Sequence, residues 1–107
     1  MAETDDFYCD RVFSGEVAVE TVRETERVLA FHYTKPSYPL HIVIVPKEHI
    51  ETLVDVADFS IVAEVFGVAQ AIIRELGLHE TGYRLITNGG AYQDSRHLHF
   101  HLISSEA

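Results

Sequence analysis

A run of three histidines near the end of the chain is the part of the sequence best suited to chemistry. His97, His99 and His101 alternate with Leu98 and Phe100. Because successive side chains of an extended strand point to opposite faces, the imidazoles share one face and the apolar side chains the other. Same-face neighbours lie roughly 6.5–7 Å apart, a spacing that suits a phosphate. Since three charged imidazoles repel one another, we expect at least one to stay neutral near pH 7 and to be available as a nucleophile.

The histidine run admits three interpretations. Imidazole is a good ligand for zinc, copper or nickel, although a metal site on one strand needs a further ligand from elsewhere. The run can equally hold a nucleophile flanked by phosphate-binding groups. The third interpretation, chance or a purification tag, is disfavoured because the histidines alternate with residues of core type.

A fourth histidine lies in the most strand-like segment of the chain, residues 40–46. His41 shares a face with Val43 and Val45, opposite Ile42 and Ile44. It either bonds a backbone carbonyl as an ordinary core histidine or belongs to the same site as the triad.

The other histidines carry weaker signals. We expect His49 to be structural, His32 to face solvent and His79 to lie in a polar turn.

The loop before the triad supplies amides and a hydroxyl to the same neighbourhood. Such a loop can present donors to phosphate oxygens, but it also has the composition of an ordinary hairpin connection. Its candidate side chains are Asn88, Gln93, Asp94 and Ser95.

Composition narrows the class of protein. The chain has 107 residues and a formal net charge of −9, which argues against nucleic acid or an anionic membrane as partner. Cys9 is the only cysteine, so no intrachain disulfide is possible. No apolar stretch reaches the ~20 residues that span a bilayer, and the first residues lack the pattern of a signal peptide. We therefore expect a single cytoplasmic domain over 1–107, with 1–6 disordered.

Periodicity predicts an α+β protein. Residues 58–76 form the main helix, with Asp58 as N-cap and Gly77 as its left-handed end. Its apolar face comprises Val62, Val65, Phe66, Ala69, Ile72, Ile73 and Leu76. The other expected elements are strands at 17–22, 27–33, 40–46, 83–87 and 97–104, and short helices or turns at 7–12 and 49–54.

These segments imply a mainly antiparallel sheet covered by one long helix, with 83–87 and 97–104 as hairpin partners. In the segment at 7–12, the side chains expected to pack inward are Phe7, Tyr8 and Val12.

The sequence resembles the histidine triad (HIT) superfamily, of the Hint-like and diadenosine polyphosphate hydrolase type. The run His97-Leu98-His99-Phe100-His101-Leu102-Ile103 is similar to its signature, and segments 28–49 and 82–88 are similar as well. The resemblance implies a five-stranded antiparallel sheet with one long and one short helix, and a homodimer. It also implies nucleotide hydrolase or transferase activity at the α-phosphate, without a cofactor.

The resemblance also implies roles for individual residues. His99 is the nucleophile and forms a nucleotidyl-histidine intermediate, His97 orients it, His101 donates to a phosphate oxygen, and His41 supports the site. Phe31, with Tyr8 and Val12, matches an apolar wall of the base pocket. Asn88 and Gln93 match polar positions near the ribose and phosphates.

The chain departs from the family pattern at several positions. Tyr33 stands where many members have a ribose-binding aspartate, which leaves the base preference open. Asp94 replaces a serine or threonine that assists the leaving group, a role that Ser95 can take over. Some members bind structural zinc through paired cysteines; with Cys9 alone, we expect no such zinc. We also expect no C-terminal extension after Ala107.

Three functional hypotheses follow. The first is a hydrolase or transferase acting on a purine nucleotide conjugate, either a nucleoside phosphoramidate or a dinucleoside polyphosphate. The second is a non-catalytic nucleotide sensor or scaffold, for which Tyr33 and Asp94 would be responsible. The third is a protein that binds metal through the triad.

Overall fold

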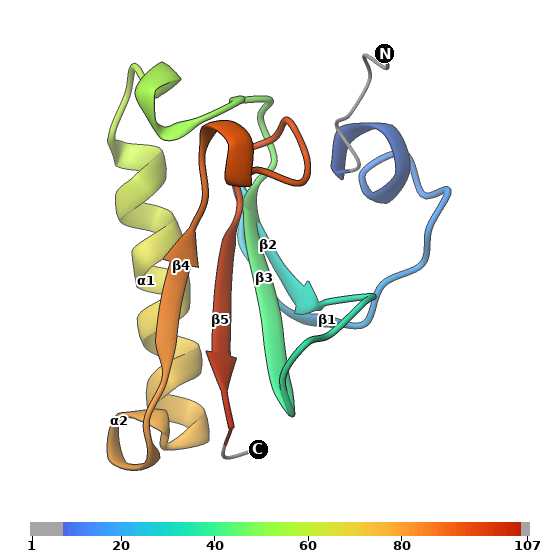
Figure 1. Ribbon diagram of the computed structural model, residues 1–107. Helices are drawn as coiled ribbons and strands as arrows, with labels where there is room; N and C mark the ends of the chain where they lie inside the picture. The colour runs from blue at the N-terminus through green and yellow to red at the C-terminus, as the bar shows by residue number, and fades with distance from the viewer. Residues whose placement is uncertain (1–7, 106–107) are drawn as a thin grey trace.

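The computed structural model describes residues 8–105, in which an antiparallel sheet is covered on one face by a long helix (Figure 1). The strands are β1 (Thr21–Glu24), β2 (Val28–His32), β3 (Leu40–Pro46), β4 (Arg84–Thr87) and β5 (Phe100–Ser104). Their spatial order is β1-β2-β3-β5-β4, and every neighbouring pair is antiparallel. The helices are α1 (Ser60–Leu76) and the short α2 (Leu78–Thr81). This is the predicted five-stranded sheet with one long and one short helix.

The side chains of the central strand β3 point alternately to the two faces of the sheet and join two different hydrophobic clusters. Ile42 and Ile44 point toward α1 and join the larger core, which also contains Phe100 and Leu102 of β5. Val43 and Val45 point to the other face, into a smaller cluster with residues of β2 and of the turn at Tyr8–Val12. Strand alternation therefore places His41 and the triad on the face opposite α1, as predicted.

The last strand is shorter than predicted and contains only one of the triad histidines. The ladder between β3 and β5 ends at Ile44 and Phe100, and the next N–H beyond, that of Leu98, donates to the carbonyl of Ile50 at 2.6 Å. Pro46, at the end of β3, has no N–H to extend the ladder. His97 and His99 therefore precede β5.

Other boundaries differ by smaller amounts. β1 begins at Thr21 instead of residue 17, and a register shift between Thr21 and Arg23 breaks its pairing. β2 is two residues shorter and β4 one residue shorter than the predicted ranges, although Arg27 and Tyr33 at the two ends of β2 still exchange backbone hydrogen bonds with Lys47 and His41. The short helix or turn predicted over 49–54 is a 3-10 turn displaced toward the C-terminus, at Leu53–Asp55.

The long helix α1 begins at Ser60, two residues later than the predicted range of 58–76. Phe59 occupies the N-cap position, and the Asp58 carboxylate instead accepts the N–H of Ser60 at 3.0 Å. Gly77 ends the helix in the left-handed conformation, with φ of 69°, as predicted.

The sheet covers only part of the predicted apolar face of α1. Val65, Ala69 and Ile72 are buried, whereas Phe66 is 51% exposed and Leu76 is 49% exposed. Part of the apolar face therefore lies beyond the edge of the core.

The remaining sequence expectations concern the chain start and the membrane. The predicted turn at 7–12 is a π-helical turn over Tyr8–Val12, with Tyr8 and Val12 buried. Phe7 and residues 1–6 lie outside the described residues. Within 8–105, no helix has the length and hydropathy to cross a membrane.

Candidate active site

Two hydrogen bonds fix the backbone of the triad where β5 begins. Leu98 donates to Ile50, and the hydroxyl of Thr87 in β4 donates to the carbonyl of His99 at 2.8 Å. The imidazoles are 0–7% exposed, while Leu98 packs into the core on the α1 side. The alternation predicted from the sequence is therefore retained even where the chain leaves the ladder.

His99 is held with one ring nitrogen occupied and the other left without a proton. Its Nδ1 lies 2.6 Å from the carbonyl oxygen of His97. A carbonyl oxygen only accepts, so the proton of the neutral ring resides on Nδ1. In this tautomer Nε2 carries the lone pair of the neutral ring, which is the state a nucleophilic imidazole needs.

His101 and His41 form a directed chain of hydrogen bonds. The backbone N–H of Ser37 donates to Nδ1 of His41 at 3.0 Å, so the proton of neutral His41 resides on Nε2. That Nε2–H points at Nδ1 of His101, 2.9 Å away. His101 must then accept at Nδ1 and carry its own proton on Nε2, where it can donate to a phosphate oxygen.

Burial keeps this chain neutral. The pKa of His101 is lowered to about 4, first by desolvation and then by the neighbouring His99 and His41, with Asp94 acting in the opposite direction. The pKa of His41 is lowered by burial. Both rings are therefore uncharged at pH 7, and the assigned proton positions hold there.

The first triad histidine faces a different set of groups. His97 donates from Nε2 to the carbonyl of Pro46 at 2.8 Å, which leaves Nδ1 as an acceptor. Nδ1 lies 3.4 Å from Sγ of Cys9, and Sγ lies 3.8 Å from Nδ1 of His49. His97 therefore acts on His99 through its backbone carbonyl, and its ring serves another cluster.

Cys9, His49 and His97 have the donor atoms of a metal site, all within 4.8 Å of one another. In tetrahedral zinc sites with bonds of about 2.0–2.3 Å, neighbouring ligand atoms are about 3.3–3.7 Å apart. The Sγ–Nδ1 distances of 3.4 Å and 3.8 Å are close to that spacing, whereas the full separation of up to 4.8 Å is wider. The three side chains would therefore have to draw together to hold an ion, which would then tie the turn at Tyr8–Val12 to the triad. Paired cysteines, on which the expectation of no structural zinc was based, differ from this set, in which two of the three donors are histidines.

Two tyrosines flank the triad on the open side. The ring centroid of Tyr8 lies 5.1 Å from that of His99, and Tyr33 lies 4.6 Å from His41 and 5.4 Å from His101. A cavity of about 200 Å³ opens between these tyrosines. Its other lining residues are Thr34, Lys35, Asp94 and Ser95.

The remaining predicted residues are more dispersed. Phe31 and Val12 are buried in the cluster behind Tyr8 and do not line the cavity. The side-chain amide of Gln93 donates to the carbonyl of Glu51, and Asn88 is half-buried at the end of β4, also away from the cavity lining. The exposed His32 faces solvent, as expected.

Sequence reasoning missed Lys35 and Ser37, both in the proline-containing loop after β2. Lys35 lines the cavity, and the N–H of Ser37 sets the tautomer of His41. The prolines indicated a loop but could not show that it folds back over the histidines.

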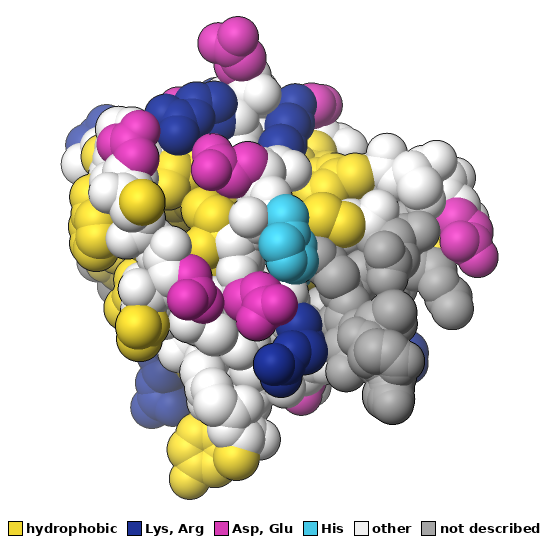
Figure 2. Space-filling view, turned by 90° about the horizontal axis from the view of Figure 1, so that it is seen from above, with side chains coloured by type: hydrophobic (Ala, Val, Ile, Leu, Met, Phe, Trp, Pro, Cys, Tyr) yellow, Lys and Arg dark blue, Asp and Glu magenta, His cyan; other side chains and the backbone are white. Residues whose placement is uncertain are grey.

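The end of the molecule that is at the top of Figure 1 carries mixed charges. Figure 2 shows acidic side chains interspersed with Lys and Arg around a surface histidine, with hydrophobic side chains toward the α1 side. Among the described residues visible in this view, no basic patch of the kind that binds nucleic acid is seen.

Comparison with known proteins agrees with this geometry. The model of the HIT domain family matches residues 14–107. An uncharacterised HIT-like protein of Chlamydia muridarum is 37% identical over 98 residues, covering 88% of this chain and 77% of its own.

Two solved structures share the fold. A histidine triad protein from Clostridium difficile superposes with a TM-score of 0.86 at 36% identity, covering 100% of this chain and 96% of its own. A HIT family hydrolase from Legionella pneumophila gives 0.85 at 33% identity, covering 95% and 94%. The fold is thus that of HIT family hydrolases, which supports a general hydrolase or transferase role. The chain belongs to the HIT domain family.

Proposed function

We propose that the protein is a nucleotide hydrolase or transferase that attacks the α-phosphate of a purine nucleotide conjugate with Nε2 of His99. The observation that carries the proposal is the hydrogen bond from Nδ1 of His99 to the carbonyl of His97. This hydrogen bond favours the tautomer of His99 with its proton on Nδ1. The attacking Nε2 therefore carries no proton before substrate binds, and no separate base is needed.

In the first step, the lone pair of Nε2 forms a bond to phosphorus, and the bond from phosphorus to the leaving group breaks. The electron pair of that bond stays with the leaving nitrogen or oxygen; a leaving nitrogen takes up a proton from water, either directly or through the hydroxyl of Ser95, which gives its own proton to the nitrogen and receives one from water. In the second step, water adds to phosphorus, the P–Nε2 bond breaks, and the electron pair returns to His99 while a proton passes to solvent. A nucleoside monophosphate and a neutral His99 result.

The neighbouring histidines stabilise the charge that develops on the phosphate oxygens. His101 donates from Nε2, and His41 keeps that proton in place by donating to the other ring nitrogen. Because both donors are neutral and buried, they are preorganised at pH 7.

Residues around the cavity are proposed to bind the nucleotide. Tyr8, with Phe31 and Val12 behind it, offers an apolar wall for the base. Tyr33 offers one hydroxyl toward the ribose, and Asn88 and Gln93 lie on the loop that approaches the phosphates. A phosphoramidate and a dinucleoside polyphosphate both satisfy this reaction scheme.

Intact-protein mass spectrometry after a brief acid-free quench tests the covalent step. Wild-type protein mixed with adenylated or guanylated phosphoramidates and dinucleoside polyphosphates should gain the mass of one nucleoside monophosphate. His99→Ala should show no adduct, while His32→Ala, which removes an exposed histidine of β2, should label normally. An adduct that persists in His99→Ala would refute the assignment of the nucleophile.

A nucleotide sensor is the second candidate function, favoured by one observation. Asp94, a carboxylate, lines the cavity where a phosphate would bind. A sensor predicts tight nucleotide binding by calorimetry with neither adduct nor product, whereas the hydrolase predicts both.

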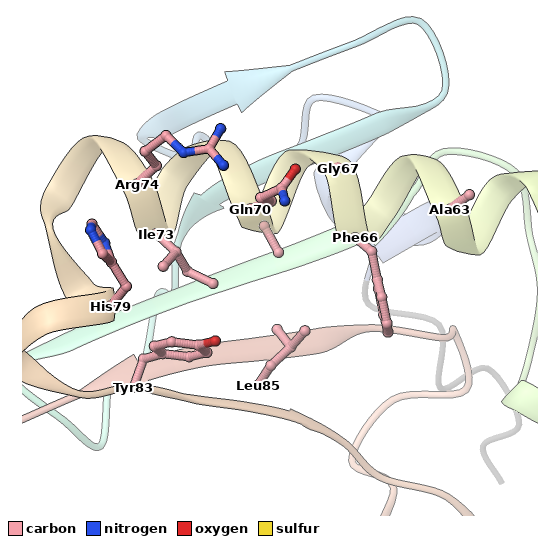
Figure 3. Close-up of a pocket in the computed structure, with 10 residues that line it drawn as sticks. Ala63, Phe66, Gly67, Gln70, Ile73, Arg74, His79, Tyr83 and Leu85 are labelled. Carbon is pink, nitrogen blue, oxygen red and sulfur yellow. The ribbon is translucent and has the colours of Figure 1, made fainter.

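We also propose that the protein forms a homodimer through the uncovered part of α1 and the edge strand β4. A cavity of about 860 Å³ lies between these elements, and Figure 3 shows Phe66, Ile73, Tyr83 and Leu85 turned toward it. Phe66 is 51% exposed and Tyr83 is 46% exposed. Within the described residues β4 pairs with β5 alone, so its outer edge can pair with a second copy.

Sedimentation at micromolar concentration tests the dimer. The wild type should have twice the chain mass of 12.1 kDa. Phe66→Asp should be monomeric, and Phe59→Asp, at an exposed position outside the cavity, should remain a dimer. A monomeric wild type would overturn this part of the proposal.

A further inference from the structure

The cavity beside the triad combines one acidic and one basic side chain. Asp94 and Lys35 both line it, together with Tyr8 and Tyr33, whose rings contact His99 and His101. Any phosphate on His99 must therefore sit near a carboxylate. Such a placement opposes anion binding unless the substrate itself compensates for the charge.

The charge of Asp94 reaches the catalytic groups. It raises the pKa of Tyr33, after the larger effect of burial, and it partly offsets the lowering of the pKa of His101. Asp94 lines the same cavity as Tyr33, and the Tyr33 ring lies 5.4 Å from that of His101, so the carboxylate is close enough to influence both groups. Within residues 8–105, no ion pair is formed by Asp94.

We infer that Asp94 is a specificity-determining residue that selects a substrate whose leaving group carries a positive charge, namely a nucleoside phosphoramidate of a cationic amine, over a dinucleoside polyphosphate. This inference rests on the proposed function and decides between its two substrate classes. Lys35 provides a positive charge for the α-phosphate, and Asp94 interacts with the charge of the leaving group attached to that phosphate.

The leaving groups of the two substrate classes carry opposite charges, so Asp94 interacts with them in opposite ways. A polyphosphate leaving group brings several further negative charges toward a site that already holds a carboxylate and a protein of net charge −9. An amine with an ammonium group brings a positive charge to the same place. Because Asp94 is exposed to solvent, screening limits the discrimination between two substrates to about tenfold at most, even where they differ by several charges.

Three adenylated substrates separate these effects. They are the phosphoramidate of propylamine, the phosphoramidate of 1,3-diaminopropane, which adds one ammonium group, and diadenosine tetraphosphate. The quantity compared is kcat/KM for wild type, Asp94→Asn, and Glu80→Gln, which removes an exposed carboxylate on α2 as a matched control.

Wild type should prefer the diaminopropane compound over the propylamine compound by about tenfold, and Asp94→Asn should bring that ratio to about one. The same substitution should raise kcat/KM for diadenosine tetraphosphate by about tenfold, and Glu80→Gln should change neither value. At 1 M salt the preference of the wild type should shrink. Ratios that are equal in wild type and Asp94→Asn would overturn the inference.

Binding measurements keep this test independent of turnover. Dissociation constants of the same compounds are measured for His99→Ala and for His99→Ala combined with Asp94→Asn. If the wild type turns over none of the substrates but Asp94→Asn removes a charge preference in binding, the proposed function fails and the inference stands. If the wild type turns them over and neither kcat/KM nor binding responds to Asp94→Asn, the inference fails and the proposed function stands.

Discussion

The two faces of the sheet use the same strands for different purposes. Toward α1, β3 and β5 present mainly apolar side chains, among them Ile42, Ile44 and Leu102, all fully buried. Toward the other face, the same strands present His41 and His101 beside Val43. Burial is nearly as complete there, but each imidazole has a hydrogen-bond partner.

The difference shows that one face of the sheet provides stability and the other provides the reactive groups. On the α1 face, free energy comes from apolar area removed from water. On the histidine face, burial costs free energy unless the polar atoms are paired, and the pairing fixes which ring nitrogen carries the proton. Alternation along a strand lets neighbouring residues serve the two purposes, so substitutions one position apart should have opposite consequences.

His99→Ala should have the largest effect on activity of any substitution on the histidine face. We expect kcat to fall by at least about 10⁴-fold, because the covalent route is lost, while nucleotide binding and the melting temperature change little. Single-turnover kinetics and calorimetry on the same preparation measure both quantities. Retention of more than a hundredth of the wild-type rate would contradict the assignment.

Leu102→Ala should produce the reverse pattern. Leu102 is fully buried under α1, and removing its side chain leaves a cavity that costs about 3 kcal/mol of unfolding free energy. Since its side chain points away from the histidines, kcat per folded molecule should stay within about twofold. Urea denaturation and active-site titration check the two parts, and a large loss of kcat would show that the faces are coupled.

Much of this division is predictable from the sequence, and the exceptions are informative. Alternation placed His41 opposite Ile42, and helical spacing located α1, because both patterns depend on local geometry. The predicted ranges of β1 and β5 both begin too early, and that of β1 also ends two residues too soon. The limits of these strands depend on which partner strand offers backbone groups, and that is a tertiary property.

The site shows the same limit. The triad and His41 are recognisable from residue type, and the structure brings them together. In contrast, Lys35, Cys9 and His49 reach the site only because a loop and the N-terminal turn fold over the sheet. Their contacts join segments up to 88 residues apart, and no pattern within the sequence encodes such distances.

His41→Ala tests whether the histidine face depends on the directed chain of hydrogen bonds. Without Nε2–H of His41, nothing assigns the tautomer of His101, and we expect kcat to fall by about 10–100-fold with KM little changed. Nitrogen NMR shifts of His101 should show a mixture of tautomers in the variant and one tautomer in the wild type. A single unchanged tautomer would remove His41 from this positioning role.

The histidine face should also make stability depend on pH. Because the pKa of His101 is about 4 in the folded protein and ordinary in the unfolded chain, the unfolded state binds more protons between about pH 6.5 and 4. Stability is therefore complete above that window and is lost as the pH falls through it, by about 1–2 kcal/mol after allowance for solvent screening. Urea midpoints at pH 7.5, 5.5 and 4.5 measure the loss.

A His101→Gln variant should lose part of this pH dependence. Glutamine keeps a side-chain amide of similar reach and does not titrate. Equal slopes of stability against pH in the variant and the wild type would assign the dependence to other groups.

The smallest expected effect concerns the cluster beside the triad. Cys9, His49 and His97 would hold Zn²⁺ with three donors, so addition of zinc to metal-free protein should raise the melting temperature by a few degrees at most. Cys9→Ser should abolish the shift and leave the melting temperature of the metal-free protein unchanged, because serine keeps the size of the side chain but is a poor zinc ligand. His79→Ala, on α2 and outside the cluster, should respond to zinc as the wild type does. An equal shift in Cys9→Ser would mean that zinc binds elsewhere, and the histidine face would then owe its order to hydrogen bonds and ring packing alone.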